Sequence, residues 1–203
     1  SMTIKAVIWD LGGVIIRTDD YAPREELAAK FGIDRAELEQ TIFAEGISDR
    51  AQRGEITTQE LWAYVGRKYD LSPDALQAFM DQFWAGDRVD HDLVDEIRAL
   101  RGEYITGLLS NAWDDLRTFI FNEWKIDDAF DSITISAEEG VAKPDARIYE
   151  IALERAGVAP QEAVFLDDMA VNIEAARRLG MHGIHFQDIE QAKATLEELL
   201  SQG

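Results

Sequence analysis

Short apolar runs alternate with helical patterns through most of the chain. Such runs are typical of parallel strands buried on both faces, and they cover Ala6–Trp9, Ile105–Leu109, Ile133–Ile135, Ala163–Leu166 and Gly183–Phe186. Apolar residues spaced three and four apart predict helices over His91–Leu100, Ala112–Trp124, Pro144–Ala156, Asn172–Leu179 and Gln187–Leu200. Strands alternating with helices predict an α/β fold: a doubly wound, Rossmann-like parallel sheet with right-handed crossovers.

Residues 20–86 interrupt this alternation, because they contain helix starts and no convincing strand. Asp34 with Glu37 and Thr57 with Glu60 have capping-box spacing, and Ser72 precedes a first-turn proline. A helical insertion after the first strand is expected to cover the carboxyl edge of the sheet, where open α/β sheets bind ligands. We therefore expect a core of residues 1–19 and 87–203 and a helical cap of residues 20–86.

The composition excludes several classes of function. The 203 residues include 40 acidic and 20 basic side chains, for a net charge of −20, so nucleic acid and anionic membrane surfaces are not expected partners. No apolar run approaches the roughly 18 residues of a membrane span, and the N-terminus resembles no signal peptide. Cysteine is absent, which excludes disulfides and thiolate sites. We expect a cytoplasmic protein, monomeric or homodimeric.

Polar side chains that could take part in catalysis or ligand binding lie at the carboxyl ends of the predicted strands. The first strand ends at Asp10 and the second at Ser110 and Asn111. Lys143 stands before a helix start that follows the third strand. The fourth ends in a pair of carboxylates, with an asparagine shortly beyond: Asp167, Asp168 and Asn172. Because carboxyl ends of parallel strands meet at one edge, we expect these groups to form one site.

In this order, the segments DLGG, LSNA, KPDARIYE and DDMAVNIEAA resemble the haloacid dehalogenase superfamily, in its branch with a helical cap. Within it they are most similar to bacterial sugar-phosphate phosphatases of the glucose-1-phosphatase type. The resemblance runs from Lys5 to about Phe186. It implies a Mg²⁺-dependent phosphomonoester hydrolase that acts on a small phosphorylated metabolite, for which a sugar phosphate is one candidate.

The resemblance also implies a role for each residue. Asp10 would be the nucleophile that forms an aspartyl-phosphate. Ser110, Asn111 and Lys143 would bind the phosphoryl group, and the backbone at Gly12 would also approach the substrate. Ser110 and Lys143 would be catalytic residues beside Asp10, whose charge Lys143 would neutralise. Trp113 is a candidate for the border of the substrate site.

Mg²⁺ would bind Asp10, Asp168 and the backbone carbonyl of Gly12, an oxygen set suited to this hard cation. Asp167 and Asn172 would orient the metal ligands from behind. Either one also has a structural explanation as a helix cap.

Gly12 departs from the family pattern, because most phosphatases of the family carry a second aspartate there as general acid and base. Three interpretations stay open. A phosphatase without this acid would depend strongly on its leaving group, so that aryl, acyl and anomeric phosphates react faster than alkyl phosphates. A protein that binds a phosphorylated ligand without hydrolysing it would not need the acid. A 2-haloacid dehalogenase would not need it either, but those relatives work without Mg²⁺. Phosphomutase activity, which needs a proton relay, is disfavoured.

Other polar residues are weaker candidates. The three histidines, at positions 91, 182 and 185, are too scattered for a metal site. Arg17, Arg50 and Arg53 are possible substrate contacts. An acid such as Asp19 or Glu45 could replace the missing aspartate only if closure of the cap brought it near.

Overall fold

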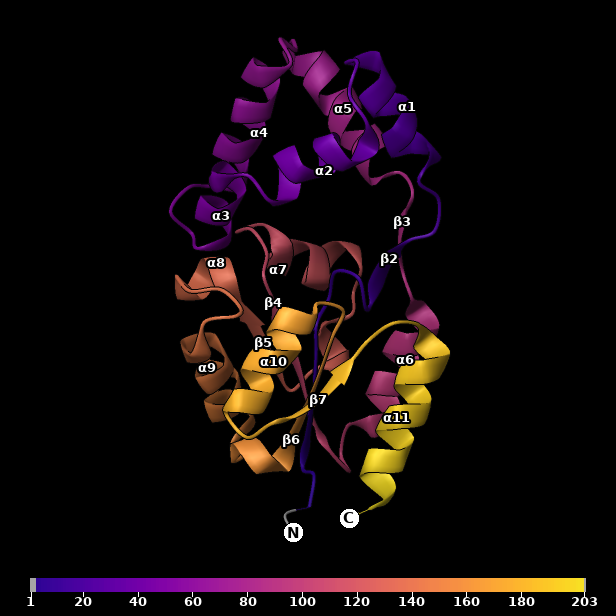
Figure 1. Cartoon of the computed structure of the whole chain (residues 1–203), viewed down its shortest axis with the longest axis vertical. Coiled ribbons are helices and arrows are strands. Elements are labelled where there is room, and N and C mark those ends of the chain that lie inside the picture. The colour runs from indigo at the N-terminus through magenta and orange to yellow at the C-terminus, as the bar shows by residue number, and fades with distance from the viewer. Residues whose placement is uncertain (1–2, 203) are drawn as a thin grey trace.

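A computed structural model of the chain describes residues 3–202, and its centre is one parallel sheet in the order β5-β4-β1-β6-β7 (Figure 1). The first strand is therefore central, and the chain adds strands on one side of it before returning to the other. The bounds are β1 (Ala6–Trp9), β4 (Ile105–Ser110), β5 (Ser132–Ile135), β6 (Ala163–Asp167) and β7 (His182–His185). This arrangement confirms the predicted doubly wound α/β fold.

Helices cover both faces of the sheet. Val7 and Trp9 of β1 pack with residues of α6 (His91–Leu100) and α11 (Ile189–Ser201). Ala6 and Ile8 point the other way, toward α9 (Ala146–Ala156) and α10 (Ala170–Arg178). All four strand residues are at most 2% exposed, which explains why the run lacks polar alternation.

The predicted helix Ala112–Trp124 is wrong over its first four residues. A loop follows β4, and helical structure begins only with α7 (Leu116–Thr118) and continues as a π-helical turn, η1 (Phe119–Glu123). The loop backbone is bonded elsewhere, because the Ser136 hydroxyl donates to the Ala112 carbonyl and accepts from its N–H. Further short elements are η2 (Asp127–Ala129), α8 (Ser136–Glu139) and η3 (Pro160–Glu162).

Between β1 and β4 the chain forms the helical insertion, α1 to α5, which lies above the carboxyl end of the sheet (Figure 1). The predicted N-caps are confirmed: the side chains of Asp34, Thr57 and Ser72 accept hydrogen bonds from backbone N–H groups in the first turns of their helices. The bounds are α1 (Ala22–Lys30), α2 (Arg35–Phe43), α3 (Gly46–Gln52), α4 (Thr58–Lys68) and α5 (Pro73–Trp84).

Two short antiparallel strands join the insertion to the sheet, and sequence analysis did not predict them. They are β2 (Ile16–Thr18) and β3 (Asp87–Val89), which run side by side at one edge of the molecule (Figure 1). Asp87 accepts bonds from Thr18 Oγ1 at 2.6 Å and from Arg24 at 2.7 Å, and so ties this connection to α1.

The first and last segments that the structure describes lie at the far end from the insertion (Figure 1). Residues 1, 2 and 203, which the expected core includes, lie outside the described residues. Within residues 3–202, no helix combines the length and apolar character needed to cross a membrane.

Candidate active site

Asp10 is the first residue beyond the central strand, and the fold buries it. Its backbone N–H donates to the Leu166 carbonyl of β6 at 2.9 Å, which continues the sheet pairing, and the residue is 7% exposed. Since β4 and β6 flank β1 on either side, Asp10 stands where the strand order reverses. Open α/β sheets bind their ligands at this position.

Lys143 is the cation closest to Asp10. Its Nζ donates to Asp10 Oδ1 at 2.8 Å, to Asp167 Oδ2 at 2.9 Å and to the Leu109 carbonyl at 3.0 Å. An ammonium group has three N–H donors, so all of them are used by the protein. The residue is 6% exposed, which means that Lys143 acts as a buried cation inside an acidic site.

The loop after β4 holds Lys143 in place. The Asn111 amide donates to the Lys143 carbonyl at 3.0 Å, and its oxygen accepts the Lys143 N–H at 2.8 Å. The Asn111 side chain therefore holds the Lys143 backbone through two hydrogen bonds. Ser110 lies buried at the end of β4. Sequence analysis predicted phosphoryl binding for both residues. The pair of hydrogen bonds from Asn111 to the Lys143 backbone is an additional feature that only the structure shows.

Asp10, Asp167 and Asp168 form an acidic cluster, with one carboxylate oxygen of each lying within 4.8 Å of the others. Burial, together with the negative charges of Asp167 and Asp168, raises the pKa of Asp10 to about 8 against the opposing effect of Lys143. Burial and Asp167 also raise the pKa of Asp168 above its usual value. Carboxylates that repel one another in this way form a donor set that fits a divalent cation with oxygen ligands.

Asp167 is fully buried and belongs to a hydrogen-bonded chain behind this cluster. Its Oδ1 accepts the Met169 N–H at 2.8 Å, and its Oδ2 accepts the Asn172 amide at 3.2 Å. The Tyr149 hydroxyl in turn donates to the Asn172 carbonyl at 2.8 Å. Tyr149 was missed by sequence analysis, although it is the tyrosine of the KPDARIYE segment.

His185 was also missed as a neighbour of the site. Its Nε2 lies 2.8 Å from the backbone carbonyl of Asp168. His185 ends β7 and pairs with Asp167 of β6, and its ring contacts the segment that carries Asp168. None of the three histidines belongs to the acidic cluster itself.

The two glycines after Asp10 differ in what surrounds them. A Cβ on Gly12 would meet nothing within 4 Å. A Cβ on Gly13 would lie 2.1 Å from Asp168 Oδ2, and the residue has a φ of +82°. Gly13 is thus required for the close approach of the loop to Asp168, whereas the space beside Gly12 would accept a side chain.

Most of the weaker candidates are bound to other residues. Arg17 donates to Asp90 at 2.5 Å, Arg50 and Arg53 pair with Glu55, and Asp19 pairs with Arg88. Glu45 accepts from Lys68 at 3.0 Å and from Tyr64 at 3.1 Å. Burial raises the pKa of Glu45, but the bonds from Lys68 and Tyr64 outweigh it and lower the pKa below its usual value. A carboxyl group with a lowered pKa is a poor proton donor.

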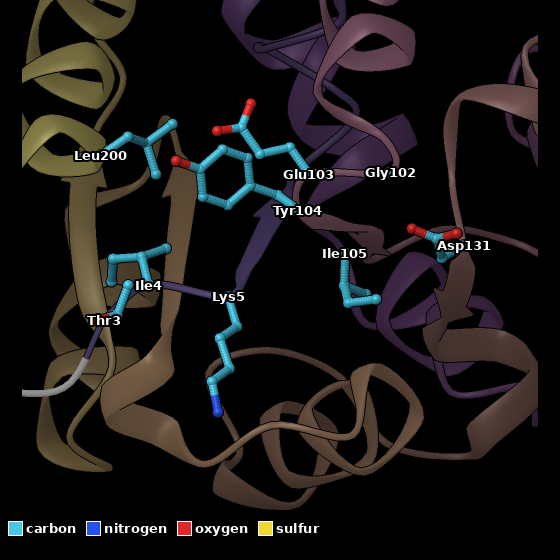
Figure 2. A pocket seen from close by; sticks show the side chains of 9 residues that line it. All are labelled: Thr3, Ile4, Lys5, Gly102, Glu103, Tyr104, Ile105, Asp131 and Leu200. Carbon is cyan, nitrogen blue, oxygen red and sulfur yellow. The ribbon is translucent and has the colours of Figure 1, made fainter. Parts of the chain in front are cut away.

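A pocket of about 660 Å³ lies at the opposite end of the sheet (Figure 2). Most of its lining comes from the chain around the starts of β1 and β4, and Asp131 and Leu200 complete it. Asp10 follows β1, so the strand separates this pocket from the acidic cluster. The pocket is therefore not part of the candidate active site.

A central nucleophile-type aspartate, a buried lysine and an acidic pair on a doubly wound sheet define a hydrolase of the haloacid dehalogenase type. The chain matches the haloacid dehalogenase-like hydrolase family over residues 4–180 and belongs to that family. The superfamily expected from the motifs is thereby confirmed.

Two of the relatives that this chain resembles are phosphatases by name. A sesquiterpene phosphatase of Aspergillus oryzae is 28% identical over 191 residues, covering 92% of this chain and 91% of the relative. D-ribitol-5-phosphate phosphatase of Bacteroides thetaiotaomicron is 29% identical over 188 residues, covering 87% of this chain and 89% of the relative.

Solved structures of the family share the fold. A haloacid dehalogenase family enzyme of Bacteroides thetaiotaomicron, crystallised with magnesium and inorganic phosphate, has a TM-score of 0.74 and 26% identity. The similarity covers 91% of this chain and 96% of that enzyme. The similarity therefore extends over most of both chains and is not limited to one part of the fold.

Proposed function

We propose that this protein is a Mg²⁺-dependent phosphomonoester hydrolase that acts on a small phosphorylated metabolite through an aspartyl-phosphate on Asp10. The observation that carries the proposal is the buried contact of Lys143 with Asp10 and Asp167, beside the exposed carboxylate of Asp168. A cation held between two carboxylates keeps a nucleophilic carboxylate in place. The phosphatase relatives support the same reaction class.

In the first step, an Asp10 carboxylate oxygen attacks phosphorus and the bond from phosphorus to the ester oxygen breaks. The ester oxygen leaves with the bonding electrons and takes a proton from water, because Gly12 offers no acid. Ser110 and Asn111, at the end of β4, would donate hydrogen bonds to the phosphoryl oxygens. Lys143 already bonds Asp10, and its charge would offset the negative charge brought by the phosphoryl group.

In the second step, water attacks the phosphorus of the aspartyl-phosphate and the bond to Asp10 breaks. Inorganic phosphate is released and the Asp10 carboxylate is regenerated. The water loses its proton to bulk solvent or to a phosphoryl oxygen. Splitting one displacement into two is the advantage of a covalent intermediate.

Asp10, Asp168 and the Gly12 carbonyl would hold Mg²⁺, with Asp167 and Asn172 positioning them. The fit rests on the three carboxylates, whose oxygens converge within 4.8 Å. When bound, the cation supplies positive charge against the phosphoryl oxygens. Asp167 bonds Lys143, Met169 and Asn172 at the same time, which suits a residue that orients its neighbours.

The helical insertion, which we propose to be a cap spanning residues 20–86, would close over this site. The side chains of the insertion, together with Trp113, would determine the substrate specificity. The named relatives act on chemically different phosphates, one a sesquiterpene derivative and one a polyol phosphate. A sugar phosphate is therefore one candidate and not the only class to test.

The test is phosphate release from p-nitrophenyl phosphate and a panel of sugar, acyl and alkyl phosphates, with Mg²⁺ and with EDTA. We expect turnover that needs the metal and is lost in Asp10→Asn, by at least about 10³-fold, since the nucleophile is removed. Asp92→Asn, an exposed carboxylate in α6, is the matched control and should retain full activity.

Three outcomes would overturn the proposal. Tight binding of phosphate esters without release of phosphate would indicate a binding protein, for which the absent acid at Gly12 is the supporting observation. Chloride release from a 2-haloacid in EDTA would indicate a dehalogenase. Turnover that survives Asp10→Asn would exclude the aspartyl-phosphate route.

A further inference from the structure

Three aromatic side chains form a wall between the helical insertion and the loop that follows β4. We call Phe43, Trp84 and Trp113 the aromatic wall. The ring centroids are 6.4 Å apart for Phe43 and Trp113, 6.2 Å for Trp84 and Trp113, and 5.8 Å for Phe43 and Trp84. Each ring therefore contacts the other two, although Phe43 ends α2, Trp84 ends α5 and Trp113 belongs to the core.

The wall is only partly covered. Trp84 is 37% exposed, and Phe43 and Trp113 are half-buried. Trp62 and Phe83 fill the space behind it: Trp62 lies 6.0 Å from Trp113, and Phe83 lies 5.5 Å from Phe43. The wall is thus the accessible edge of the aromatic core of the insertion.

The wall is close to the candidate active site. Trp113 comes three residues after Ser110, and three residues of extended chain span at most about 11 Å. Ser110 ends the strand next to β1, and neighbouring strands are separated by about 4.8 Å. Asn111 holds the intervening loop to Lys143, and the Asp114 side chain bonds Thr58 of the insertion at 2.5 Å. The position of Trp113 is therefore fixed from both sides.

A second apolar group borders the acidic cluster from α10. Met169 directly follows Asp168 and is 55% exposed, and Val171 in the first turn of α10 is also exposed. Side chains of this kind are costly to leave in water. Apolar surface next to the carboxylates therefore adds to the aromatic wall on the side of the insertion.

Positive charge near the wall is already neutralised by the chain itself. Arg24 packs on the Phe83 ring with 4.3 Å to its centroid, is buried, and pairs with Asp87 at 2.7 Å. Arg17 pairs with Asp90, and Lys68 with Glu45. The surroundings of the site therefore favour a substrate whose single phosphate is its only charged group.

Building on the proposed phosphatase function, we propose that the substrate is a monophosphate ester with an apolar leaving group, an aryl or isoprenoid hydrocarbon. The phosphate lies at Asp10 and the hydrocarbon lies against Phe43, Trp84 and Trp113. Aromatic rings recognise hydrocarbon by area and stacking, and such contacts do not depend on the acid missing at Gly12.

The first experiment compares kcat/KM for esters with similar leaving-group chemistry and different apolar area. Phenyl phosphate is set against 1-naphthyl phosphate, and D-ribitol 5-phosphate against geranyl phosphate. We expect the larger hydrocarbon to be preferred in each pair by at least about tenfold, mainly through KM. A preference for naphthyl alone identifies an aryl substrate, and a preference for geranyl alone an isoprenoid one.

The second experiment removes one ring. Trp84→Ala is expected to raise KM for the preferred apolar ester about tenfold while leaving inhibition by inorganic phosphate unchanged, and Trp84→Phe should restore most of the loss. Phe121→Ala is the matched control, since Phe121 is a similarly exposed ring of η1 that lies outside the wall. Equal KM changes in both alanine variants would overturn the proposal.

Binding to Asp10→Asn separates this inference from the proposed reaction. We expect 1-naphthyl or geranyl phosphate to bind this variant at least about tenfold more tightly than inorganic phosphate, measured by calorimetry. The same titration of the wild-type protein in EDTA repeats the test without a substitution. Tight apolar binding with no turnover of any ester would refute the phosphatase and keep the apolar site. Turnover of phosphate esters whose binding and kcat/KM do not improve with the size of the hydrocarbon would refute the apolar site and leave the proposed reaction intact.

Discussion

At the scale of single residues, the site is organised around one buried cation whose three donors are all used. Lys143 bonds two aspartates and a backbone carbonyl, and its ammonium group lies 5.3 Å from the centroid of the Phe165 ring. Burial on its own would lower the pKa of Lys143, but Asp10 and Asp167 raise it above its usual value. The lysine therefore stays charged, which is what a site about to receive a phosphate needs.

Gly12→Asp tests whether the missing acid limits the reaction. A side chain fits, since a Cβ there meets nothing within 4 Å. We expect hydrolysis of alkyl phosphates to rise by about tenfold or more, because general acid catalysis contributes roughly 10²–10⁴ in rate. Aryl phosphates should gain less, as their leaving groups depart more readily. Equal gains for both classes would show that protonation of the leaving group is not limiting.

Gly13→Ala tests the neighbouring position, where no side chain fits. Its Cβ would lie 2.1 Å from Asp168 Oδ2 in a backbone conformation with φ of +82°. We expect at least about a 10²-fold loss of activity and weaker Mg²⁺ binding in a calorimetric titration. Gly12→Ala is the control for an added methyl group and should bind Mg²⁺ normally. Normal metal binding by Gly13→Ala would contradict this account of the turn.

At the scale of elements, side chains at helix starts connect parts of the chain that are distant in sequence. Asp90 accepts the Leu93 N–H at 2.9 Å as the N-cap of α6, and its other oxygen accepts from Arg17 of β2. Asp114 bonds the first residue of α4 through both its N–H and its hydroxyl. One carboxylate thus anchors the β2–β3 connection, and another anchors the insertion to the core.

Asp90 should make stability depend on pH. Burial raises its pKa, but the Leu93 N–H and Arg17 outweigh burial and lower the pKa below the usual value. A lowered pKa means that the stabilisation is present above pH 4 and is lost as pH falls through the folded pKa. We expect Asp90→Ala to cost about 1–2 kcal/mol at pH 7 in urea unfolding. Asp90→Asn keeps a side chain that can cap the helix. The amount by which its free energy of unfolding falls below that of the wild-type protein should shrink toward pH 3. A deficit that is constant between pH 7 and pH 3 would argue against this role.

At the scale of the whole molecule, the insertion contacts the core at two separate places. One is the β2–β3 connection. The other is where α3 meets α8 (Figure 1) and where the loop after β4 contacts α2, α4 and α5. At the second place Gly54 is so close that a Cβ would lie 2.2 Å from the Ala137 carbonyl oxygen. The described structure is therefore closed, with the insertion resting on the core opposite its connection.

Gly54→Ala should open this closed arrangement. The added methyl group cannot fit against Ala137, so we expect kcat/KM to fall by about tenfold or more and the radius of gyration in small-angle scattering to rise. Gly32→Ala is the matched control, because Gly32 also has a positive φ of +69° but nothing within 4 Å of its Cβ. If both variants lose activity equally, backbone strain and not closure is the cause.

Sequence reasoning succeeded where one local pattern determines the outcome. The five core strands lie where their apolar runs predict them, within one or two residues, and the three helix caps in the insertion accept the expected bonds. It failed over the first four residues of Ala112–Trp124, where the Ser136 hydroxyl bonds the Ala112 backbone and the Asp114 side chain bonds Thr58 of the insertion. It also missed β2 and β3, which are three residues each and too short for periodicity to reveal.

The assigned roles of the site residues and the division into core and cap stay predictions. The structure brings Asp10, Lys143, Asp167 and Asp168 together, and it places Asn111 against Lys143. Trp113 proved to belong to a wall shared with the insertion, which its place in the sequence did not indicate.

The sequence by itself determined the sheet, the family and the ends of strands at which chemistry would lie, because strand burial and turn residues are local properties. Tertiary structure alone decided which of these groups are in contact and that Lys143 uses all its donors. It also decided that there is space for a side chain at Gly12 but not at Gly13, and that the rings of the aromatic wall contact one another. The physical reason is that contacts between residues distant in the chain depend on how the insertion packs on the core. No pattern within one segment carries that information.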